Sequence, residues 1–281
     1  VATFYHHFDV IKEDQAPPPP LTVRVCESIS CEMSGAKKLT EDLKKLFPIG
    51  SVSTEKIRIQ AVPCVGRCMD APVAVVGKNP VDQATLESVK DCVEKKDIQP
   101  TLPKYVNFAE YQKYGGYQLF QDCLSGKIDK ESVITELKNS GLRGLGGAGF
   151  PVGSKWEIVR KFPEPRLMAI NIDEGEPGTF KDRHYLESDP HRFLEGSLIA
   201  SYAVEIGEIY IYLRDEYTAA REILLREIVE LQSAFSQMLP EIHLRRGAGA
   251  YICGEESAMI ESIEGKRGIP RLRPPYVAEV G

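Results

Sequence analysis

Four cysteines in two closely spaced pairs place the strongest constraint on how this chain can fold. Cys26 and Cys31 form a C-x4-C pair, and Cys64 and Cys68 form a C-x3-C pair. Each pair directly follows a predicted strand, in a loop where the thiolates can converge on one centre. Four thiolates suit either a [2Fe–2S] cluster or a tetrahedral zinc ion. Structural zinc pairs usually have the shorter C-x2-C spacing, so this pattern favours iron–sulfur.

The residues around the quartet support a metal centre. Pro63, Gly66 and Gly35 allow the tight backbone turns and the N–H···S hydrogen bonds that iron–sulfur clusters use. The alternative is four unrelated thiols that happen to pair in sequence. Four unrelated thiols would not be expected to form two close pairs that both follow a predicted strand, so this alternative is less favoured.

The remaining cysteines and the overall composition limit the class of protein. Cys92, Cys123 and Cys253 have no close partner and are expected to be small core residues. Seven cysteines in 281 residues are too few for a disulfide scaffold, so we expect a reducing, cytoplasmic setting. A net charge of -6 disfavours broad nucleic-acid binding. No apolar run approaches the ~20 residues of a membrane span.

The length, above the ~100–200 residues of one domain, predicts two domains. Residues 1–15 are assigned to the end of an upstream segment, and the prolines of 16–20 to a stiff linker. The first domain, residues 21–98, has a thioredoxin-like layout. Its predicted strands are 21–28, 56–63 and 71–77, and its predicted helices are 34–47, capped by Ser34, and 82–96, starting at Asp82.

A Pro- and Tyr-rich connection, residues 99–118, leads to a second domain at 119–281. Its predicted helices are near 129–140, 191–205 and 216–238, and its predicted strands are 166–171, 208–213 and 241–246. The alternation of helices and strands predicts an α/β fold with a largely parallel sheet. Neither chain end reads as a natural terminus, so we expect a segment of a longer polypeptide.

A glycine loop lies early in the second domain. Gly144, Gly146 and Gly149 match G-x-G-x-x-G, but a helix precedes them, whereas the dinucleotide fingerprint requires a strand. Glycines still permit close approach to a phosphate or a planar ring, and Lys155 could supply a positive charge. For this loop alone, a purely structural turn is a fair alternative.

A second glycine loop strengthens the case for a ligand site. Gly247, Gly249 and Gly254 follow a predicted strand, and Glu255 and Glu256 open the next helix. The helix dipole alone could account for those two carboxylates, because it stabilises negative charge at a helix N-terminus.

Three further carboxylates crowd the loop after strand 166–171. Asp173, Glu174 and Glu176 lie at the carboxyl end of that strand, where α/β sheets place ligands. They could bind a hard cation, although no run here has the ligand spacing of a calcium loop. Two glycine loops together with an acidic loop predict a nucleotide or flavin site.

Four long motifs then carry a family resemblance. Residues 143–156, 171–183, 245–257 and 264–276 resemble the FMN- and NADH-binding flavoprotein subunit of respiratory complex I, over about residues 119–281. The opening VATFYHHFDV and the cysteine quartet resemble the thioredoxin-like [2Fe–2S] subunit of the same complex. Their fusion resembles the diaphorase subunits of NAD-dependent molybdenum or tungsten formate dehydrogenases and of NAD-reducing hydrogenases. Asn171-Ile172-Asp173 and IYIYLRDEY favour the formate dehydrogenase β subunit.

The resemblance implies roles for matching positions. FMN would be held by Gly144, Gly146, Lys155, Asn171, Asp173, Glu174, Gly254 and Glu255. NADH would contact Phe150, Glu176, Glu256, Arg273 and Tyr276. Arg273 and Tyr276 replace the lysine and phenylalanine usual in the family, and keep the charge and the ring. The cluster would be held by Cys26, Cys31, Cys64 and Cys68, and a [4Fe–4S] cluster is expected in a later segment that this sequence does not contain.

The resulting hypothesis is electron transfer between NAD(H) and iron–sulfur clusters through FMN, with no side chain acting as a nucleophile. The expected partner is the catalytic α subunit of a molybdenum or tungsten formate dehydrogenase, with no nucleic acid and no membrane span. One alternative keeps the chemistry in a hydrogenase or in complex I. Another is a non-enzymatic assembly module that binds zinc or a cluster and whose glycine loops are only structural.

Overall fold

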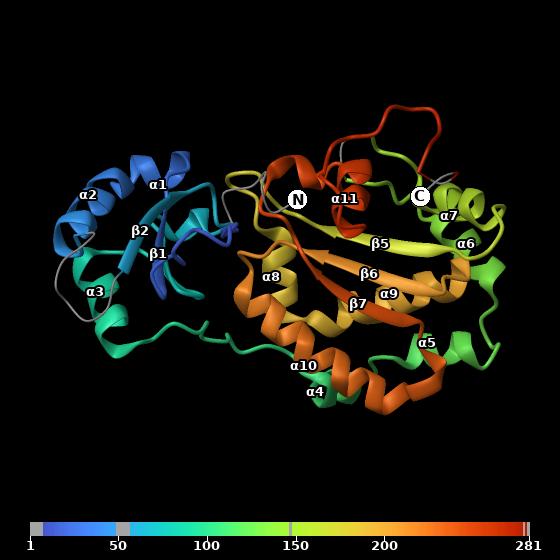
Figure 1. Cartoon of the computed structure of the whole chain (residues 1–281). Coiled ribbons are helices and arrows are strands. Elements are labelled where there is room, and N and C mark those ends of the chain that lie inside the picture. The colour runs from blue at the N-terminus through green and yellow to red at the C-terminus, as the bar shows by residue number, and fades with distance from the viewer. Residues whose placement is uncertain (1–7, 49–56, 146–147, 278, 280–281) are drawn as a thin grey trace.

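The computed structural model describes residues 8–48, 57–145, 148–277 and 279. The chain forms two α/β lobes joined by a connection that runs along one side of the molecule (Figure 1). No helix within the described ranges is long and apolar enough to cross a membrane.

The first lobe is a four-stranded sheet in the order β2-β1-β3-β4. Strands β1 (Leu21–Cys26) and β2 (Ile57–Val62) are parallel, whereas β3 (Ala74–Val76) and β4 (Asn79–Val81) complete the sheet in antiparallel fashion. Helices α1 (Ile29–Met33), α2 (Ala36–Leu46) and α3 (Leu86–Lys95) accompany the sheet, and a short 3-10 turn, η1, spans Cys68–Asp70. The core is aliphatic, with Val23 and Val25 of β1 fully buried. This is the predicted thioredoxin-like domain.

Two helix starts differ from the prediction. Ser34 does not cap α2; it ends the unpredicted helix α1 and donates its hydroxyl to the carbonyl of Ser30. Gly35, with φ +96°, separates the two helices, because few other residues adopt that conformation. Helix α3 begins at Leu86 rather than at Asp82, because the Thr85 hydroxyl accepts a hydrogen bond from the Ser88 N–H and caps the helix there.

The sequence 71–77 also behaves differently from the single long strand that was predicted. Only Ala74–Val76 pair as β3, and the chain turns at Gly77-Lys78 into β4. Strand β4 contains Pro80, which lacks an N–H, and β4 is the last strand in the sheet order. Proline is tolerated at such an edge, so Asn79 and Pro80 begin a strand that was not predicted.

The second lobe is built on the parallel sheet β5-β6-β7, as predicted. Its strands are β5 (Leu167–Ile172), β6 (Glu208–Leu213) and β7 (Glu241–Arg246). Ile209 and Ile211 of β6 pack in one core cluster with residues of helices α9 (Pro190–Val204) and α10 (Thr218–Phe235). Tyr212 of β6 joins a separate cluster with Met259 of helix α11 (Glu256–Ile263). The sheet therefore has helices on both faces.

Helix α6 (Lys130–Asn139) was predicted, and four others were not. The unpredicted helices are α4 (Phe108–Lys113), α5 (Gln118–Leu124), α7 (Val152–Arg160) and α8 (Lys181–Ser188). Helix α4 lies in the stretch predicted to be a plain connection. The buried Glu227 of α10 holds it there, accepting hydrogen bonds from the Tyr105 hydroxyl (2.7 Å) and the Phe108 N–H (3.1 Å).

Candidate functional site

The four cysteines of the quartet lie together at one end of the first sheet. Cys26, Cys31 and Cys64 are buried, Cys68 is half-buried, and the Cys64 and Cys68 sulfurs are 3.3 Å apart. No three of the four sulfurs lie within 4.8 Å of one another, since among the described residues only a separate Glu-Glu-His set meets that spacing. A single zinc ion with Zn–S bonds of about 2.3 Å holds its sulfurs about 3.8 Å apart. A two-iron centre needs the sulfurs to approach one another only in pairs, as Cys64 and Cys68 do.

Backbone N–H groups donate hydrogen bonds to two sulfurs of the quartet. The Gly66 N–H donates to Cys64 Sγ (3.3 Å), as the sequence predicts, and the Gly178 N–H of the second lobe donates to Cys68 Sγ (3.1 Å). Such donors stabilise the negative charge of thiolate ligands.

Burial and mutual contact shift the pKa values of the four thiols. Burial raises the pKa of Cys31 and of Cys68. A hydrogen bond between Cys26 and Cys64 lowers the pKa of Cys26 and raises that of Cys64, and burial adds to the latter. The pKa is therefore lowered at one thiol and raised at the other three. Four buried thiolates need a compensating positive charge, which bound iron supplies.

Three of the predicted flavin residues converge at the end of β5. The Asn171 side-chain N–H donates to the carbonyl of Gly254 (2.7 Å), and its side-chain oxygen accepts from the Asp173 N–H (3.0 Å). A Cβ on Gly254 would lie 3.2 Å from the Asp173 carbonyl oxygen, so glycine permits this close approach. The acidic loop and the second glycine loop are thereby joined.

Asp173 has an unusual environment within this group. Its Oδ2 atom is buried and has no hydrogen-bond partner among the described residues. Burial raises the pKa of Asp173 to about 7, against the opposing charge of Arg214. A buried polar atom without a partner is rare. This atom fits a pocket whose ligand supplies the missing donor, as the ring N–H or ribityl hydroxyls of a flavin can.

The carboxylates at the start of α11 have two distinct roles. Glu255 Oε2 accepts from the N–H groups of Ser257 (3.0 Å) and Ala258 (2.9 Å), so this side chain caps the helix. The Arg273 guanidinium contacts both Glu255 and Glu256, the latter at 2.8 Å. Helix capping therefore accounts for Glu255 Oε2, whereas Arg273 ties the last predicted motif to this end of the site.

Glu174 is buried and is engaged within the protein. Its carboxylate accepts from the N–H groups of Asp182 and Arg183, which begin α8, and from the Tyr217 hydroxyl (2.8 Å). Both carboxylate oxygens are thus occupied. Glu174 anchors the acidic loop to α8 and α10.

The other predicted nucleotide residues are exposed. These are Gly144, Phe150, Lys155, Asn171, Glu176, Glu256, Arg273 and Tyr276. The Gly144 N–H bonds the Phe150 carbonyl (2.9 Å), which closes the first glycine loop on itself. Glu176 accepts from the Tyr251 hydroxyl (2.8 Å), a second link between the acidic and second glycine loops. Gly146 lies outside the described residues.

A polar interface joins the quartet to the second lobe. The buried Arg214 donates to the carbonyl of Glu174 (2.6 Å) and to that of Cys64, and Arg183 donates to the carbonyl of Gly66 (3.1 Å). Gly66 lies against the Tyr217 ring so closely that an added Cβ would collide with it. The two lobes are therefore in direct contact beside the cysteines.

Arg183, Arg214 and Tyr217 were not predicted as site residues. They nevertheless stand in two of the motifs that carry the family resemblance, residues 171–183 and IYIYLRDEY. The arginine after strand β6 was the available signal, because a charge directly after a buried strand needs a partner.

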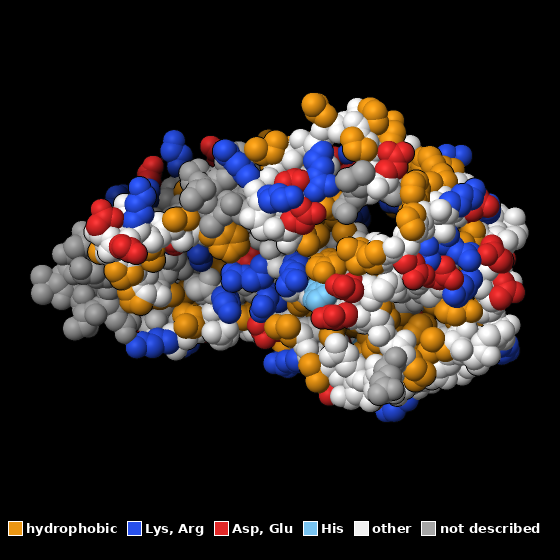
Figure 2. Space-filling model, turned by 45° about the vertical axis from the view of Figure 1, so that its right-hand side comes forward, with side chains coloured by type: hydrophobic (Ala, Val, Ile, Leu, Met, Phe, Trp, Pro, Cys, Tyr) orange, Lys and Arg blue, Asp and Glu red, His pale blue; other side chains and the backbone are white. Residues whose placement is uncertain are grey.

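A cleft of about 700 Å³ also lies where the two lobes meet, and Figure 2 shows basic side chains gathered on this face. Six basic and four acidic side chains line it. Asp9 pairs with Arg58 (2.7 Å) and Asp215 with Arg246 (2.5 Å), so part of the charge is neutralised locally. The walls come from segments far apart in the chain, which is why no sequence motif predicted the cleft.

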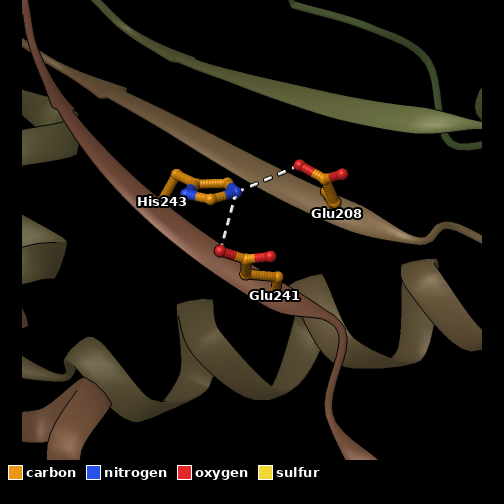
Figure 3. Close-up of side chains that lie close together, drawn as sticks. All are labelled: Glu208, Glu241 and His243. Atoms are coloured by element: carbon orange, nitrogen blue, oxygen red, sulfur yellow. Dashed lines mark hydrogen bonds and ion pairs between the residues drawn. The ribbon is translucent and has the colours of Figure 1, made fainter.

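A second cluster of possible metal ligands lies elsewhere. Glu208 and Glu241 begin β6 and β7, and His243 Nε2 lies 3.1 Å and 3.5 Å from their carboxylates (Figure 3). The set is partly exposed, and the His243 ring stacks on Tyr210 at 4.5 Å. This cluster lies at the end of the strands opposite to Gly247. The ion pairs between His243 and the two glutamates explain it without a metal ion.

Comparison with known proteins accords with this two-part architecture. Residues 1–97 match the thioredoxin-like [2Fe-2S] ferredoxin family, and residues 137–281 match the Nuo51 FMN-binding domain. The chain is similar to an NADH-quinone oxidoreductase subunit of Aquifex aeolicus (48% identity, 64% of this chain, 43% of the relative). It is also similar to an NADH-quinone oxidoreductase subunit of Rhizobium meliloti (45% identity, 61% of this chain, 42% of the relative).

Among solved structures, a NAD+-reducing [NiFe]-hydrogenase chain in the air-oxidized state resembles almost the whole chain. The TM-score is 0.80 at 29% identity, covering 98% of this chain and 50% of that one. The chain thus spans half, or less than half, of the length of these relatives. Since the Nuo51 match extends over more than half of the sequence and lies downstream of the ferredoxin match, the chain belongs to the Nuo51 FMN-binding family, with a thioredoxin-like [2Fe-2S] ferredoxin domain in front.

Proposed function

We propose that this chain is the diaphorase part of an NAD-dependent oxidoreductase and moves electrons between NAD(H) and iron–sulfur clusters through FMN. The observation that carries the proposal is the contact between the two lobes. The acidic loop of the FMN-binding domain reaches the cysteine quartet, with the Gly178 N–H 3.1 Å from Cys68 Sγ. A flavin site and a metal centre that share one loop are suited to electron exchange.

FMN, when bound, exchanges a hydride with NAD(H) and passes single electrons to iron–sulfur centres. Asn171, Asp173 and Gly254 would form the closed end of its pocket, with the Asp173 carboxylate accepting from the flavin. Gly144, Gly146 and Lys155 would lie along its phosphate. Glu174 and Glu255 would act mainly by holding the acidic loop and α11 in place, because their oxygens already bond to the protein.

The dinucleotide would lie on the exposed side of the same site. Glu176, Glu256 and Arg273 offer charged groups to its ribose and phosphate, and Phe150 and Tyr276 offer exposed rings for stacking. Their role is to orient the nicotinamide, which contributes to rate by proximity. Cys26, Cys31, Cys64 and Cys68 would bind the [2Fe–2S] cluster.

A visible and EPR spectrum of the holoprotein, with iron and flavin counts, tests this function. We expect flavin absorption that NADH bleaches, and a [2Fe–2S] EPR signal after reduction. Cys64→Ser should abolish the EPR signal while the flavin remains, and Cys92→Ser serves as a matched control, since Cys92 lies on α3 outside the quartet. A colourless protein that contains zinc would support the assembly-module alternative instead.

For the partner we propose the molybdenum or tungsten α subunit of a cytoplasmic formate dehydrogenase. The sequences Asn171-Ile172-Asp173 and IYIYLRDEY support this choice, because they resemble the formate dehydrogenase β subunit. A further [4Fe–4S] cluster would belong to the longer protein. A NAD-reducing hydrogenase is the second candidate, because the hydrogenase chain matches 98% of this one.

Purification of the native complex distinguishes the two partners. Molybdenum or tungsten with formate-dependent NAD+ reduction supports a formate dehydrogenase. Nickel with hydrogen-dependent NAD+ reduction would establish the hydrogenase and exclude the first proposal.

A further inference from the structure

We propose that the FMN-binding domain tunes the [2Fe–2S] cluster of the ferredoxin domain, through a hydrogen bond that the Gly178 N–H donates to Cys68 Sγ. The inference rests on the proposed cysteine ligands and adds a residue that no cysteine motif contains. Gly178 is 110 positions from Cys68 and belongs to the other lobe. Gly178 can therefore reach the cysteine only when the two lobes are folded and in contact.

The local backbone explains why this N–H is available. The Thr179 N–H bonds the Glu176 carbonyl (3.0 Å), Pro177 occupies the next position, and Gly178 has φ +87°. Proline followed by a glycine of positive φ within such a hydrogen-bonded turn is the type II pattern. The turn is closed by Thr179, so the Gly178 N–H is left to bond outside it. The acceptor that it meets is Cys68 Sγ.

The donor and the acceptor are held from both sides. Glu174 fixes the acidic loop four residues before Gly178, through the Asp182 N–H and the Tyr217 hydroxyl. Arg214 links the Glu174 carbonyl to that of Cys64, so the same guanidinium holds the acidic loop and the cysteine loop together. The distance between Gly178 and Cys68 is therefore set by buried contacts rather than by a free surface loop.

The expected electrostatic effect has a definite sign. Reduction adds an electron to the cluster, and hydrogen bonds to its ligand sulfurs stabilise the added negative charge, which raises the reduction potential. The positive charge of the buried Arg214 acts in the same direction. Cys68 is the most exposed of the four cysteines, and its sulfur accepts the hydrogen bond from the Gly178 N–H. Loss of the donor should lower the potential of the cluster.

Two substitutions at Gly178 both disturb a backbone of φ +87°, and only one of them also removes the donor. Gly178→Pro removes the N–H, whereas Gly178→Ala keeps it; the added Cβ of alanine meets no atom within 4 Å, so Gly178→Ala reports the effect of backbone strain with the N–H present. Each holoprotein is titrated with dithionite, and the EPR signal of the reduced cluster gives the midpoint potential. We expect Gly178→Pro to fall below both the unchanged protein and Gly178→Ala. A tenfold loss of reduced cluster at fixed potential corresponds to about 59 mV for one electron.

If Gly178→Pro does not fold, the hydrogen bond can be detected directly in the unchanged protein. Chain labelled with [15N]glycine is reduced, and the 15N hyperfine couplings of the cluster are recorded. We expect two coupled glycine nitrogens, from Gly66 and Gly178, and only one in Gly178→Ala, whose residue 178 is unlabelled. A single glycine coupling in the unchanged protein, or equal potentials in a folded Gly178→Pro, overturns the inference. Absence of any cluster signal would instead refute the proposed function.

Discussion

Asp173 shows how one residue can be costly to the fold and useful to the site. One of its carboxylate oxygens is buried without a partner among the described residues, and burial raises its pKa to about 7. An ionised carboxylate in that position costs free energy unless a ligand donates to it. A ligand that supplies the donor therefore gains affinity from a group that weakens the fold.

The pKa of Asp173 predicts a pH dependence of stability for the flavin-free chain. Its folded pKa lies above the unfolded value, so its protonated form favours the fold at low pH, and this stability is lost as the pH rises from about 4 through 7. The loss is roughly 4 kcal/mol at most, at about 1.36 kcal/mol per pKa unit. Urea unfolding at three pH values across that window measures it. Asp173→Asn should remove this slope; an unchanged slope would contradict the assignment.

At the scale of elements, strand β6 illustrates how one strand serves two faces. Ile209 and Ile211 enter the core with α9 and α10, whereas Tyr212 packs in the cluster that includes Met259 of α11. The Tyr212 hydroxyl accepts from the Ala248 N–H (2.9 Å) and bonds the Ser262 hydroxyl (2.9 Å). The strand thereby fixes the second glycine loop.

Tyr212→Phe should therefore destabilise the chain by about 1–2 kcal/mol, because it leaves the buried Ala248 N–H without an acceptor. Tyr210→Phe on the same strand is the matched control and should change stability by less than about 0.5 kcal/mol, since Tyr210 is partly exposed and its hydroxyl bonds Glu208. Denaturant unfolding compares them. Equal losses would show that the loop does not depend on Tyr212.

Elements with a strong local pattern were predicted well and those held by distant contacts were not. Strands β6 and β7 have the predicted bounds, because β-rich runs between helices identify a parallel sheet without other information. Helix α8 was missed, because its start depends on Glu174, which is buried only after the lobe folds. The hydrogen-bond partners of Arg214 could not be predicted from the sequence either, since one of them, Cys64, belongs to the other lobe.

At the scale of the whole molecule, the buried arginine at the interface should matter far more than an exposed one. Arg214→Lys loses the guanidinium that serves the carbonyls of Glu174 and Cys64, and should cost about 3 kcal/mol. Arg246→Lys weakens the ion pair of an exposed arginine with Asp215 and should cost less, about 1 kcal/mol. Thermal unfolding of both variants measures the difference. Similar losses would mean that the interface contributes little.

Gly66→Ala tests the closeness of the two lobes. The new methyl would collide with the Tyr217 ring, and φ +74° adds backbone strain, so we expect a loss of about 2 kcal/mol or more. Gly126→Ala has a similar φ, +76°, and no atom within 4 Å of the added Cβ, so it measures the strain alone. Tyr217→Leu should recover part of the Gly66→Ala loss. No difference between the two alanine variants would contradict the packing.

Three of the contacts between the lobes use main-chain carbonyls of the ferredoxin domain. Arg214 and Arg183 bond the carbonyls of Cys64 and Gly66, and Thr218 bonds the carbonyl of Lys78 (2.8 Å). Main-chain carbonyls are the same whatever side chain a residue carries. These three contacts therefore tolerate a change of side chain in the ferredoxin domain, whereas the glycine facing Tyr217, the Cys68 sulfur and the Arg67 guanidinium are contacts that depend on the residue.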